Sequence, residues 1–516
     1  MERRLRMLHV ALTACGALAA CNRGWITTVG PDFQKPTPET EQQWLVESAI
    51  LQEGSKKKIN ALKNWWAKFD DPVLIRLISA AEEVNSNMAV ARSNIVQARS
   101  SFIQSNAAGI PDLTFNTGYN YNSIFIQGLN PEALGLTKTN NIGLNLEQYK
   151  GGLQSSWEVD LFGGIARQEE ASGSDLQSRA LEWHDTRISV AVETANAYVD
   201  YRHCQALLNF DEEDDRERQT AGALIKQLRV AGFRSDADAH LADATIADGI
   251  SNVMSKKNEC QQSLKGLVYL TGMKEAQLKR LIDAVGEQKG KLPDPPYFSV
   301  NSLPGEVIAQ RLDVRVAERQ LQAASANAGV ADAKLYPSLK ITGNISAALA
   351  NLNINSLALM GLGLRTWSVG PSFELPIFDY GKRVAASQAA YENLNAAFSN
   401  FNQIVRKSIR EIETALLDLE RLNVVISLAR QSAEGYQRSF DGQRELYRSG
   451  LSNLINALNS RRDTIRAHRT LKTLEFQRIG ALIRLYRAVG GDWDLGKPSD
   501  LDKQSADEIS KRLSDP

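Results

Sequence analysis

The sequence is poor in the features that mark several common protein classes. It has four cysteines and five histidines in 516 residues, and its 60 basic residues are matched by 60 acidic ones. This balanced charge gives no reason to expect a nucleic-acid partner. After the first twenty residues, no uninterrupted apolar run approaches the length of about 18 residues that crosses a bilayer as a helix. A membrane-crossing part would therefore have to be a closed β-barrel.

Motifs for catalysis and metal binding are missing as well. No HExxH or Cys-x-x-Cys spacing involves the four later histidines, His184, His203, His240 and His468. Gly361-Leu362-Gly363 lacks the third glycine and the strand-to-helix setting of a nucleotide-binding loop. Asp200, His203 and Cys204 can share one face of a helix, but three such residues on a long helix are more often incidental. We expect no catalytic residues, no metal and no cofactor.

What is present begins with a secretion signal. Three arginines precede an uncharged stretch from Met7 to Ala20, which is too short to span a bilayer. Leu18-Ala19-Ala20-Cys21 resembles the lipobox of bacterial lipoproteins, whose cysteine is acylated before cleavage; a chance cysteine in an ordinary signal is the alternative. We predict a signal peptide over 1–20, a lipidated Cys21 carrying palmitate, and an extended segment over 21–62. Asn22, where inner-membrane lipoproteins have Asp, favours the outer membrane.

The rest of the chain contains one pattern twice. The stretch VARSNIVQARSSFIQSNAAGIPDLTFNTG (90–118) aligns with VAERQLQAASANAGVADAKLYPSLKITGN (316–344) at an offset of 226. SSWEVDLFGG (155–164) aligns with PSFELPIFDYG (371–381), and Gly232 aligns with Gly450. Shared landmarks in the same order indicate a duplication. We predict a first repeat over 63–287, a linker over 288–303, a second repeat over 304–491 and a polar tail over 492–516.

Each repeat has two charge-poor segments in which apolar and polar residues alternate, as in β-strands. These segments are 112–127 and 141–161 in the first repeat, and 338–350 and 362–378 in the second. One face is apolar, as in Phe115 and Tyr119, and the other is polar, as in Asn116 and Asn120. A soluble sandwich also alternates, but the lipoprotein start favours lipid-facing strands around a wet interior. Because four strands cannot close a barrel, we expect three chains to share twelve.

Long helices flank the strands. Residues 379–448 contain no proline and span about 100 Å as a helix. Apolar residues from Phe398 to Phe440 recur at the alternating three-four spacing of a coiled-coil seam. We predict helical hairpins over 165–270 and 379–489, turning at Gly232 and Gly450, where glycine permits a positive φ. The predicted fold is mostly α-helical with a membrane β-barrel shared by a trimer.

Two cysteines are left after the signal is removed and Cys21 is lipidated. Cys204 and Cys260 lie 28 residues before and after Gly232, so an antiparallel hairpin places them at the same height. The exported compartment is oxidising. A disulfide also needs Cα atoms within about 7 Å and side chains that face each other. The sequence leaves two alternatives, a disulfide and two independent buried thiols.

Four stretches carry a family likeness: VGPDFQKP (29–36), NWWAKFDDPVLIRLISAA (64–81), VRVAERQLQAASANAGVADAKLYPSLKITG (314–343) and LYRAVGGDW (485–493). With these, the chain resembles the TolC/OprM family of outer-membrane efflux channels, in the lipoprotein branch often labelled NodT. One departure is Arg311-Leu312-Asp313, where members usually have Arg-Pro-Asp at a helix start. The resemblance implies a homotrimer with a twelve-stranded barrel in the outer membrane and an α-helical barrel across the periplasm. It also implies two partners, a periplasmic adaptor and an inner-membrane pump of the RND type.

The resemblance also assigns roles to residues near the tip glycines. Family members commonly carry acids six and nine positions after the second tip glycine, where this chain has Asn456 and Asn459. Asp236 and Asp238 follow the first tip glycine, so an acidic gate ring would come from the first hairpin, and we expect weak cation selectivity. The alternative is that both carboxylates only favour a helix N-terminus. Adaptor docking is expected at the tip residues Arg229, Gly232, Ser235, Arg448, Gly450 and Ser452.

The implied function is a passive exit duct for drugs or other toxic small molecules in a tripartite efflux system. One alternative is a conduit for secreted polypeptides of the type I kind, although the lipid anchor and the VGPDFQKP stretch look more like drug-efflux members. A second alternative is a lipid-anchored periplasmic coiled coil that conducts nothing. The two-faced strands argue against that alternative.

Overall fold

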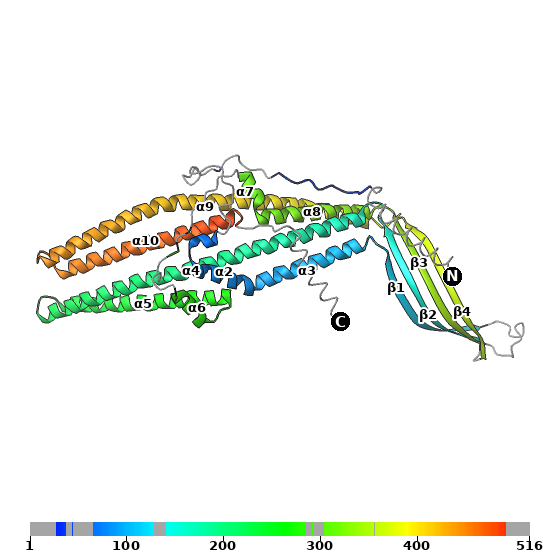
Figure 1. Cartoon of the computed structure of the whole chain (residues 1–516), viewed down its shortest axis with the longest axis horizontal. Coiled ribbons are helices and arrows are strands. Elements are labelled where there is room, and N and C mark those ends of the chain that lie inside the picture. Colours follow the sequence, from blue (N-terminus) through cyan, green and yellow to red (C-terminus); the bar gives the residue numbers. More distant parts are fainter. Residues whose placement is uncertain are drawn as a thin grey trace. The chain divides into compact units, whose positions relative to one another are not determined.

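The computed structural model describes residues 27–37, 44, 65–127, 141–284, 292–293, 295, 304–354 and 357–491 (Figure 1). The predicted signal peptide, Cys21 and the tail over 492–516 lie outside the described residues, as does most of the linker over 288–303. Among the helices that the structure describes, none is both long and apolar enough to cross a membrane.

The order of elements is the same in both halves of the chain. The first half contains α3 (Ser86–Ala107), β1 (Asp112–Gln127), β2 (Asn141–Val159), α4 (Gly164–Val230) and α5 (Asp236–Thr271). The second half contains α8 (Leu312–Ala333), β3 (Ser338–Ile354), β4 (Leu357–Glu374), α9 (Lys382–Arg448) and α10 (Leu454–Ala488). Helices α4 and α9 have 67 residues each, and α5 and α10 have 36 and 35. The elements of the two halves therefore correspond in order and in length.

The compact units do not coincide with the repeats. One unit consists of Met1–Pro36, Ile95–Ser178 and Glu318–Asn400, and the other of Thr37–Asn94, Arg179–Ala317 and Phe401–Pro516. Each unit takes segments from both halves of the chain. A single repeat would leave its sheet and its helices without their packing partners, which explains why the division runs across the repeats.

The first unit contains a four-stranded antiparallel sheet in the order β1-β2-β3-β4 (Figure 1). Tyr119 pairs with Tyr149, which pairs with Leu349, so these residues share one face. This face, called the apolar face here, also carries the exposed side chains of Leu113, Phe115, Leu153, Ile345, Trp367 and Val369. The opposite, polar face has Asn116 bonded to Gln154 at 3.3 Å and Asn344 bonded to Ser368 at 2.8 Å. The alternation read from the sequence thus gives a two-faced sheet.

An extended N-terminal segment crosses the same unit. The Val29 N–H donates to the Phe162 carbonyl at 3.1 Å, just before α4 begins. Arg167 of α4, which is buried, donates to the Val29 carbonyl and to the carboxylate of Asp32. A Cβ added to Gly30, whose φ is +85°, would meet the Gly329 Cα of α8 at 2.3 Å. The Val-Gly-Pro-Asp stretch therefore has a structural role, because it lets the chain lie against helices of both repeats.

The second unit contains most of the two helical hairpins, α4–α5 and α9–α10, including the ends that carry the tip glycines (Figure 1). The predicted seam of α9 is buried along most of its length, at Phe401, Val405, Ser408, Ile412, Ala415, Leu419, Leu422, Ile426 and Ala433. Phe398 and Tyr436, near the two ends of the seam, are exposed. Three-four spacing places these residues on one stripe of the helix, which packs inside the unit.

The tryptophan stretch that begins at Trp65 lies in this unit's core. Trp65 is fully buried and stacks on Tyr486 of α10, with ring centroids 4.5 Å apart. Two residues after the short 3-10 helix η4 (Trp66–Phe69), Asp71 caps α2 (Pro72–Val84) by accepting from Val73 N–H at 3.0 Å. The other Asp71 oxygen accepts from the Tyr198 hydroxyl of α4 at 2.8 Å. A single carboxylate thus joins the start of the first repeat to its hairpin.

Some predicted bounds differ from the structure. The last strand ends at Glu374 and not at 378, because Pro376 has no N–H to donate to a ladder. Helix α9 begins at Lys382 and not at 379, because the Asp379 carboxylate accepts the N–H groups of Gly381 and Arg383 and forms a turn. Further helices, α6 (Glu275–Asp283) and α7 (Pro304–Gln310), flank the region between the repeats.

Candidate functional site

The tips of the two hairpins have the same backbone structure. At the first tip, Gly232 has φ +78° and the Phe233 N–H donates to the Leu228 carbonyl at 2.8 Å. At the second tip, Gly450 has φ +74° and the Leu451 N–H donates to the Leu446 carbonyl at 2.8 Å. This is the Schellman arrangement that ends a helix at a left-handed residue. Both predicted tip glycines are therefore required by the turn.

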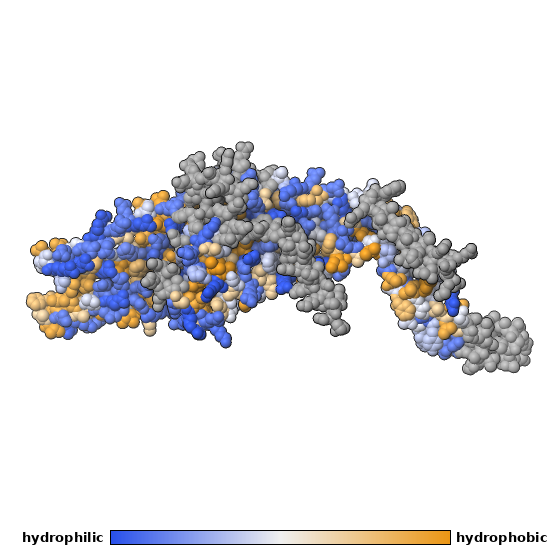
Figure 2. Space-filling view, in the orientation of Figure 1, coloured by the Kyte–Doolittle hydropathy of each residue, from blue (hydrophilic) through white to orange (hydrophobic). Residues whose placement is uncertain are grey.

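Exposed apolar side chains flank both turns. Phe233 and Leu451, which occupy corresponding positions, are each 77% exposed. Val230 is 82% exposed, and Tyr447 is 41% exposed. Figure 2 shows apolar, orange residues at the ends of both hairpins among hydrophilic, blue ones. The tips thus present apolar side chains that the described part of the chain leaves exposed.

The two acids predicted at the gate are tied to their own helix end. Ser235 and Asp238 form a capping box: the Asp238 N–H donates to the Ser235 hydroxyl oxygen at 3.1 Å, and the Ser235 N–H donates to the Asp238 carboxylate at 3.2 Å. The Ser235 N–H and the Ser235 hydroxyl both donate to the Asp238 carboxylate and thereby lower the pKa of Asp238. Asp236, more exposed, pairs with Arg229 at 3.2 Å. The helix-end role named as the alternative is therefore present.

The corresponding positions of the second tip are uncharged and exposed. Asn453 caps α10 by accepting the Asn456 N–H at 2.9 Å. Asn456 and Asn459 are both exposed. Ser452 donates to the Gln443 side chain at 3.3 Å, and Arg448 pairs with Glu445 at 3.7 Å. The two tips share a fold but differ in charge where the returning helix begins, because the first turn of α5 contains two carboxylates and that of α10 contains none.

A disulfide joins α4 to α5 above the first tip. The sulfurs of Cys204 and Cys260 are bonded, and their Cα atoms lie 5.5 Å apart. The equal spacing of both cysteines from Gly232 predicted that they lie at one height, and the structure confirms it. Of the two alternatives, the structure therefore has the disulfide.

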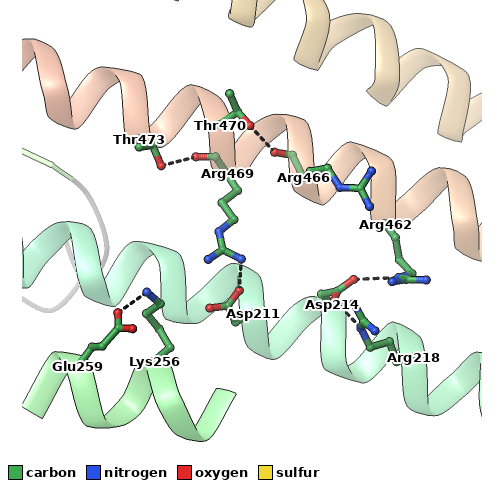
Figure 3. Close-up of polar contacts among 10 residues, drawn as sticks. All are labelled: Asp211, Asp214, Arg218, Lys256, Glu259, Arg462, Arg466, Arg469, Thr470 and Thr473. Atoms are coloured by element: carbon green, nitrogen blue, oxygen red, sulfur yellow. Dashed lines mark hydrogen bonds and ion pairs between the residues drawn. The ribbon is translucent and has the colours of Figure 1, made fainter. Parts of the chain in front are cut away.

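Ion pairs connect the first hairpin to α10 (Figure 3). Asp211 of α4 accepts from Arg469 at 2.6 Å, and Asp214 accepts from Arg462 at 3.0 Å. Glu213 pairs with Arg461 in the same row. Asp214 also accepts from Arg218 of its own helix at 2.6 Å, and these arginines lower its pKa although burial acts in the opposite direction. We call these three acids and their α10 partners the interhairpin pairs.

Sequence reasoning missed the interhairpin pairs. Residues 211–217 read Asp-Glu-Glu-Asp-Asp-Arg-Glu, which by itself indicates only a solvated helix face. The basic residues of α10 lie about 250 positions later, with separations of 248 and 258 for two of the pairs. The only signal was the coincidence of an acidic run on one hairpin and a basic run on the other.

The buried Arg311 was also missed. It donates to the carboxylates of Asp313 at 2.8 Å and Glu411 at 2.7 Å, and to the Ala488 carbonyl at the end of α10 at 2.6 Å. The family departure at Leu312 does fall at a helix start, because α8 begins there. In the part of the chain that the structure describes, no group of three or more His, Cys, Asp or Glu side chains is placed to hold a metal.

These features, the two-faced sheet, the paired hairpins and the matching tips, define a class of outer-membrane transport protein. The sequence matches the outer membrane efflux protein family over residues 77–273 and 303–491, which follow the two repeats. The chain belongs to this family. It is the outer-membrane component of a tripartite efflux system, which also contains an adaptor and an inner-membrane pump, and it is not an enzyme.

Known proteins agree with this assignment. The solvent efflux pump outer membrane protein SrpC of Pseudomonas putida is 25% identical over 469 residues, covering 90% of this chain and 96% of its own length. The cation efflux system protein CusC of Escherichia coli (strain K12) is 25% identical over 488 residues, covering 93% and 100%. The solved structure of the outer-membrane channel OprN is 26% identical, with a TM-score of 0.76, and covers 90% of this chain and 99% of its own. The resemblance to TolC/OprM-type channels is confirmed.

Proposed function

We propose that the chain is the passive exit duct for toxic small molecules, and that three copies form it. The observation that carries this proposal is the two-faced sheet, in which aromatic and aliphatic side chains line one face and amides and hydroxyls the other. Three such sheets make twelve strands, with the apolar faces toward lipid and the polar faces toward water. The long hairpins of the three chains then continue the duct as a helical barrel through the periplasm.

The N-terminal segment supports a lipid anchor at Cys21. Six positions separate Cys21 from Thr27, a reach of at most about 20 Å for an extended chain. Val29 is fixed beside Phe162, where β2 has ended and α4 is about to begin. Acyl chains on Cys21 can therefore reach the membrane surface at the base of the sheet, and more than one chain is needed for durable anchoring.

The gate is proposed at the tips, where the hairpins converge on the threefold axis. The first hairpin contributes Asp236 and Asp238 to it, and the second contributes Asn456 and Asn459. Arg229 partly neutralises Asp236, which supports a weak acidic ring. We expect little preference for cations at this end, and less still in Asp236→Asn. This preference for cations is measured as the reversal potential of reconstituted channels in a KCl gradient. Strong cation selectivity in the natural protein would contradict a weak acidic ring at the gate.

The adaptor is proposed to dock on both tips. Phe233 and Leu451 supply apolar contacts, and Arg229, Ser235, Arg448 and Ser452 supply polar ones around Gly232 and Gly450. A photo-crosslinking amino acid at Leu451 should capture the adaptor in cells, whereas one at exposed Leu113 on the sheet should not. Capture at both positions, or at neither, would count against tip docking.

The pump is proposed to be of the RND type.

The experiment that tests the function is solute accumulation. Dyes, antibiotics and metal ions are measured inside the source bacterium with the chain, without it, and with a Cys21→Ala copy. Loss of the chain should raise accumulation of at least one small-molecule class, and the Cys21→Ala copy should restore export only in part. Unchanged accumulation, together with loss of a secreted polypeptide, would replace this proposal with polypeptide secretion.

A further inference from the structure

Charge is sparse on the polar face of the sheet and is unevenly placed. At the base of the strands, Lys340 lies 3.5 Å from Glu158, and Glu374 lies 3.8 Å from Arg383 of α9. Asp112 accepts the Ser156 N–H at 2.5 Å. These groups are near the helices and largely neutralise one another. Above them, the described side chains of this face are amides, hydroxyls and apolar groups, with one exception.

That exception is Lys150 in β2. Register places it opposite Gly118 of β1 on one side and Ala348 of β3 on the other, and Ala348 lies opposite Leu364 of β4. Its row therefore contains no other polar side chain, and its two immediate neighbours are too small to cover it. Lys150 is exposed, and no carboxylate among the described residues forms an ion pair with it. Its ammonium group thus lies on the polar face with no ion-pair partner among the residues that the structure describes.

The position of Lys150 along the strand separates it from the charges at the base. Lys150 and Glu158 are eight residue steps apart in β2, which is about 27 Å along a strand. That separation exceeds the screening length of about 8 Å at physiological ionic strength. The pairs at the base therefore do not cancel the field of Lys150.

We propose that Lys150 is a charge-selectivity residue of the membrane end of the duct. This inference rests on the proposed function, because three copies must place three polar faces around one lumen. The three ammonium groups then form a positive ring that raises the local concentration of anions and of solutes with an anionic group, and lowers that of cations. The ring is opposite in sign to the carboxylates of the first tip.

The chain offers a matched control one strand row away. Arg365 of β4 pairs with Ala347, and Ala347 with Gly151, so Arg365 lies on the apolar face next to the row of Lys150. Arg365→Gln removes the same charge at a similar height on the other side of the sheet. Only a charge that faces the lumen can alter what passes through it.

The test measures the local potential with charged thiol reagents. Ser346→Cys places a reporter on the polar face, two rows along the sheet from Lys150. Its rates of reaction with an anionic and with a cationic methanethiosulfonate reagent, added outside intact cells, are compared in three backgrounds: unchanged, Lys150→Gln and Arg365→Gln. We expect Lys150→Gln to lower the anionic-to-cationic rate ratio about threefold at low ionic strength, and Arg365→Gln to leave it unchanged. Reconstituted channels should show a matching fall in chloride over potassium permeability.

The outcomes distinguish a failure of this inference from a failure of the proposed function as a duct. If the reporter reacts well but its anionic-to-cationic rate ratio is the same in the Lys150→Gln background as in the unchanged one, the inference is overturned. The proposed duct is not contradicted by that result. An equal change in the Arg365→Gln background also overturns the inference, because the effect would not come from the lumen. A reporter at Ser346 that reacts with neither reagent, in channels that conduct no ions, contradicts the duct itself.

Discussion

His203 occupies an environment that opposes its positive charge. Its ring stacks on Phe476 of α10, with centroids 4.1 Å apart and planes within 4°. Burial, together with the nearby cations Lys256, Arg469 and Lys472 on α5 and α10, lowers the pKa of His203 to about 4. The ring is therefore neutral at pH 7 and serves as an aromatic contact between hairpins. The proximity to Asp200 and Cys204 noted in the sequence is incidental, because Cys204 is held in the disulfide.

This environment predicts acid sensitivity. Since the pKa of His203 is lower in the folded protein than its ordinary value near 6.5, the unfolded chain binds the proton more readily between about pH 4 and 6.5, and folding stability falls as pH falls through that window. His203→Phe keeps the stack and removes the proton site, so it should recover about 1 kcal/mol per chain at pH 5. Thermal melting in detergent at pH 7.5 and pH 5 measures the difference. The exposed His240, replaced by Gln, is the control, and an equal benefit from both variants would refute the explanation.

At the scale of elements, the parts set by local pattern could be predicted from the sequence. Period-two alternation gave the first strand with its observed bounds, 112–127, and three-four spacing gave the buried stripe of α9. The equal height of Cys204 and Cys260 followed from their equal spacing about a glycine, but the spacing left open whether the two cysteines form a disulfide or stay as separate thiols. These features depend on residues that are near in sequence or related by one turn.

Contacts between distant elements could not be predicted in the same way. Arg167 is buried against a segment 135 positions earlier, and Arg311 reaches Ala488 from 177 positions away. Nothing in the local sequence distinguishes these arginines from the many that are solvated. The role of Asp238 as a cap was readable from Ser235-x-x-Asp238, but the sequence could not decide between this role and a place at the gate.

The interhairpin pairs can be tested as an element-scale contact. Asp211 is largely buried and pairs with the more exposed Arg469. Asp211→Arg should leave two cations facing each other and loosen α10 against α4, whereas the double exchange Asp211→Arg with Arg469→Asp should restore much of the contact, with a coupling of about 1 kcal/mol. Hydrogen exchange of α10 amides measures this loosening. Lys226 and Asp243, an exposed pair within the first hairpin, exchanged in the same way, should have little effect. Additive effects of the two single changes at Asp211 and Arg469 would show that the pair is not coupled.

For the whole molecule, the direction in which each face of the sheet points decides the proposed architecture. The apolar face carries Phe115 and the polar face carries its neighbour Asn116 in the same strand, and Phe115 is 69% exposed in the single chain. A soluble protein rarely leaves so many large apolar side chains uncovered on one sheet. Lipid is the proposed environment that covers them, with water on the other face.

A pair of substitutions at adjacent positions tests this orientation. Phe115→Arg places a charge toward lipid, where it costs up to about 2–4 kcal/mol at the bilayer midplane, and three chains multiply that cost within one barrel. Asn116→Arg places the same charge toward water and costs only the hydrogen bond to Gln154 at 3.3 Å. Phe115→Arg should therefore reduce the amount of trimer in outer-membrane fractions severalfold, while Asn116→Arg should leave it near the natural level. Heat-modifiable migration on gels measures the trimer. If Asn116→Arg were the more damaging change, the faces would be reversed, and Lys150 would then point to lipid and lose its proposed role in the lumen.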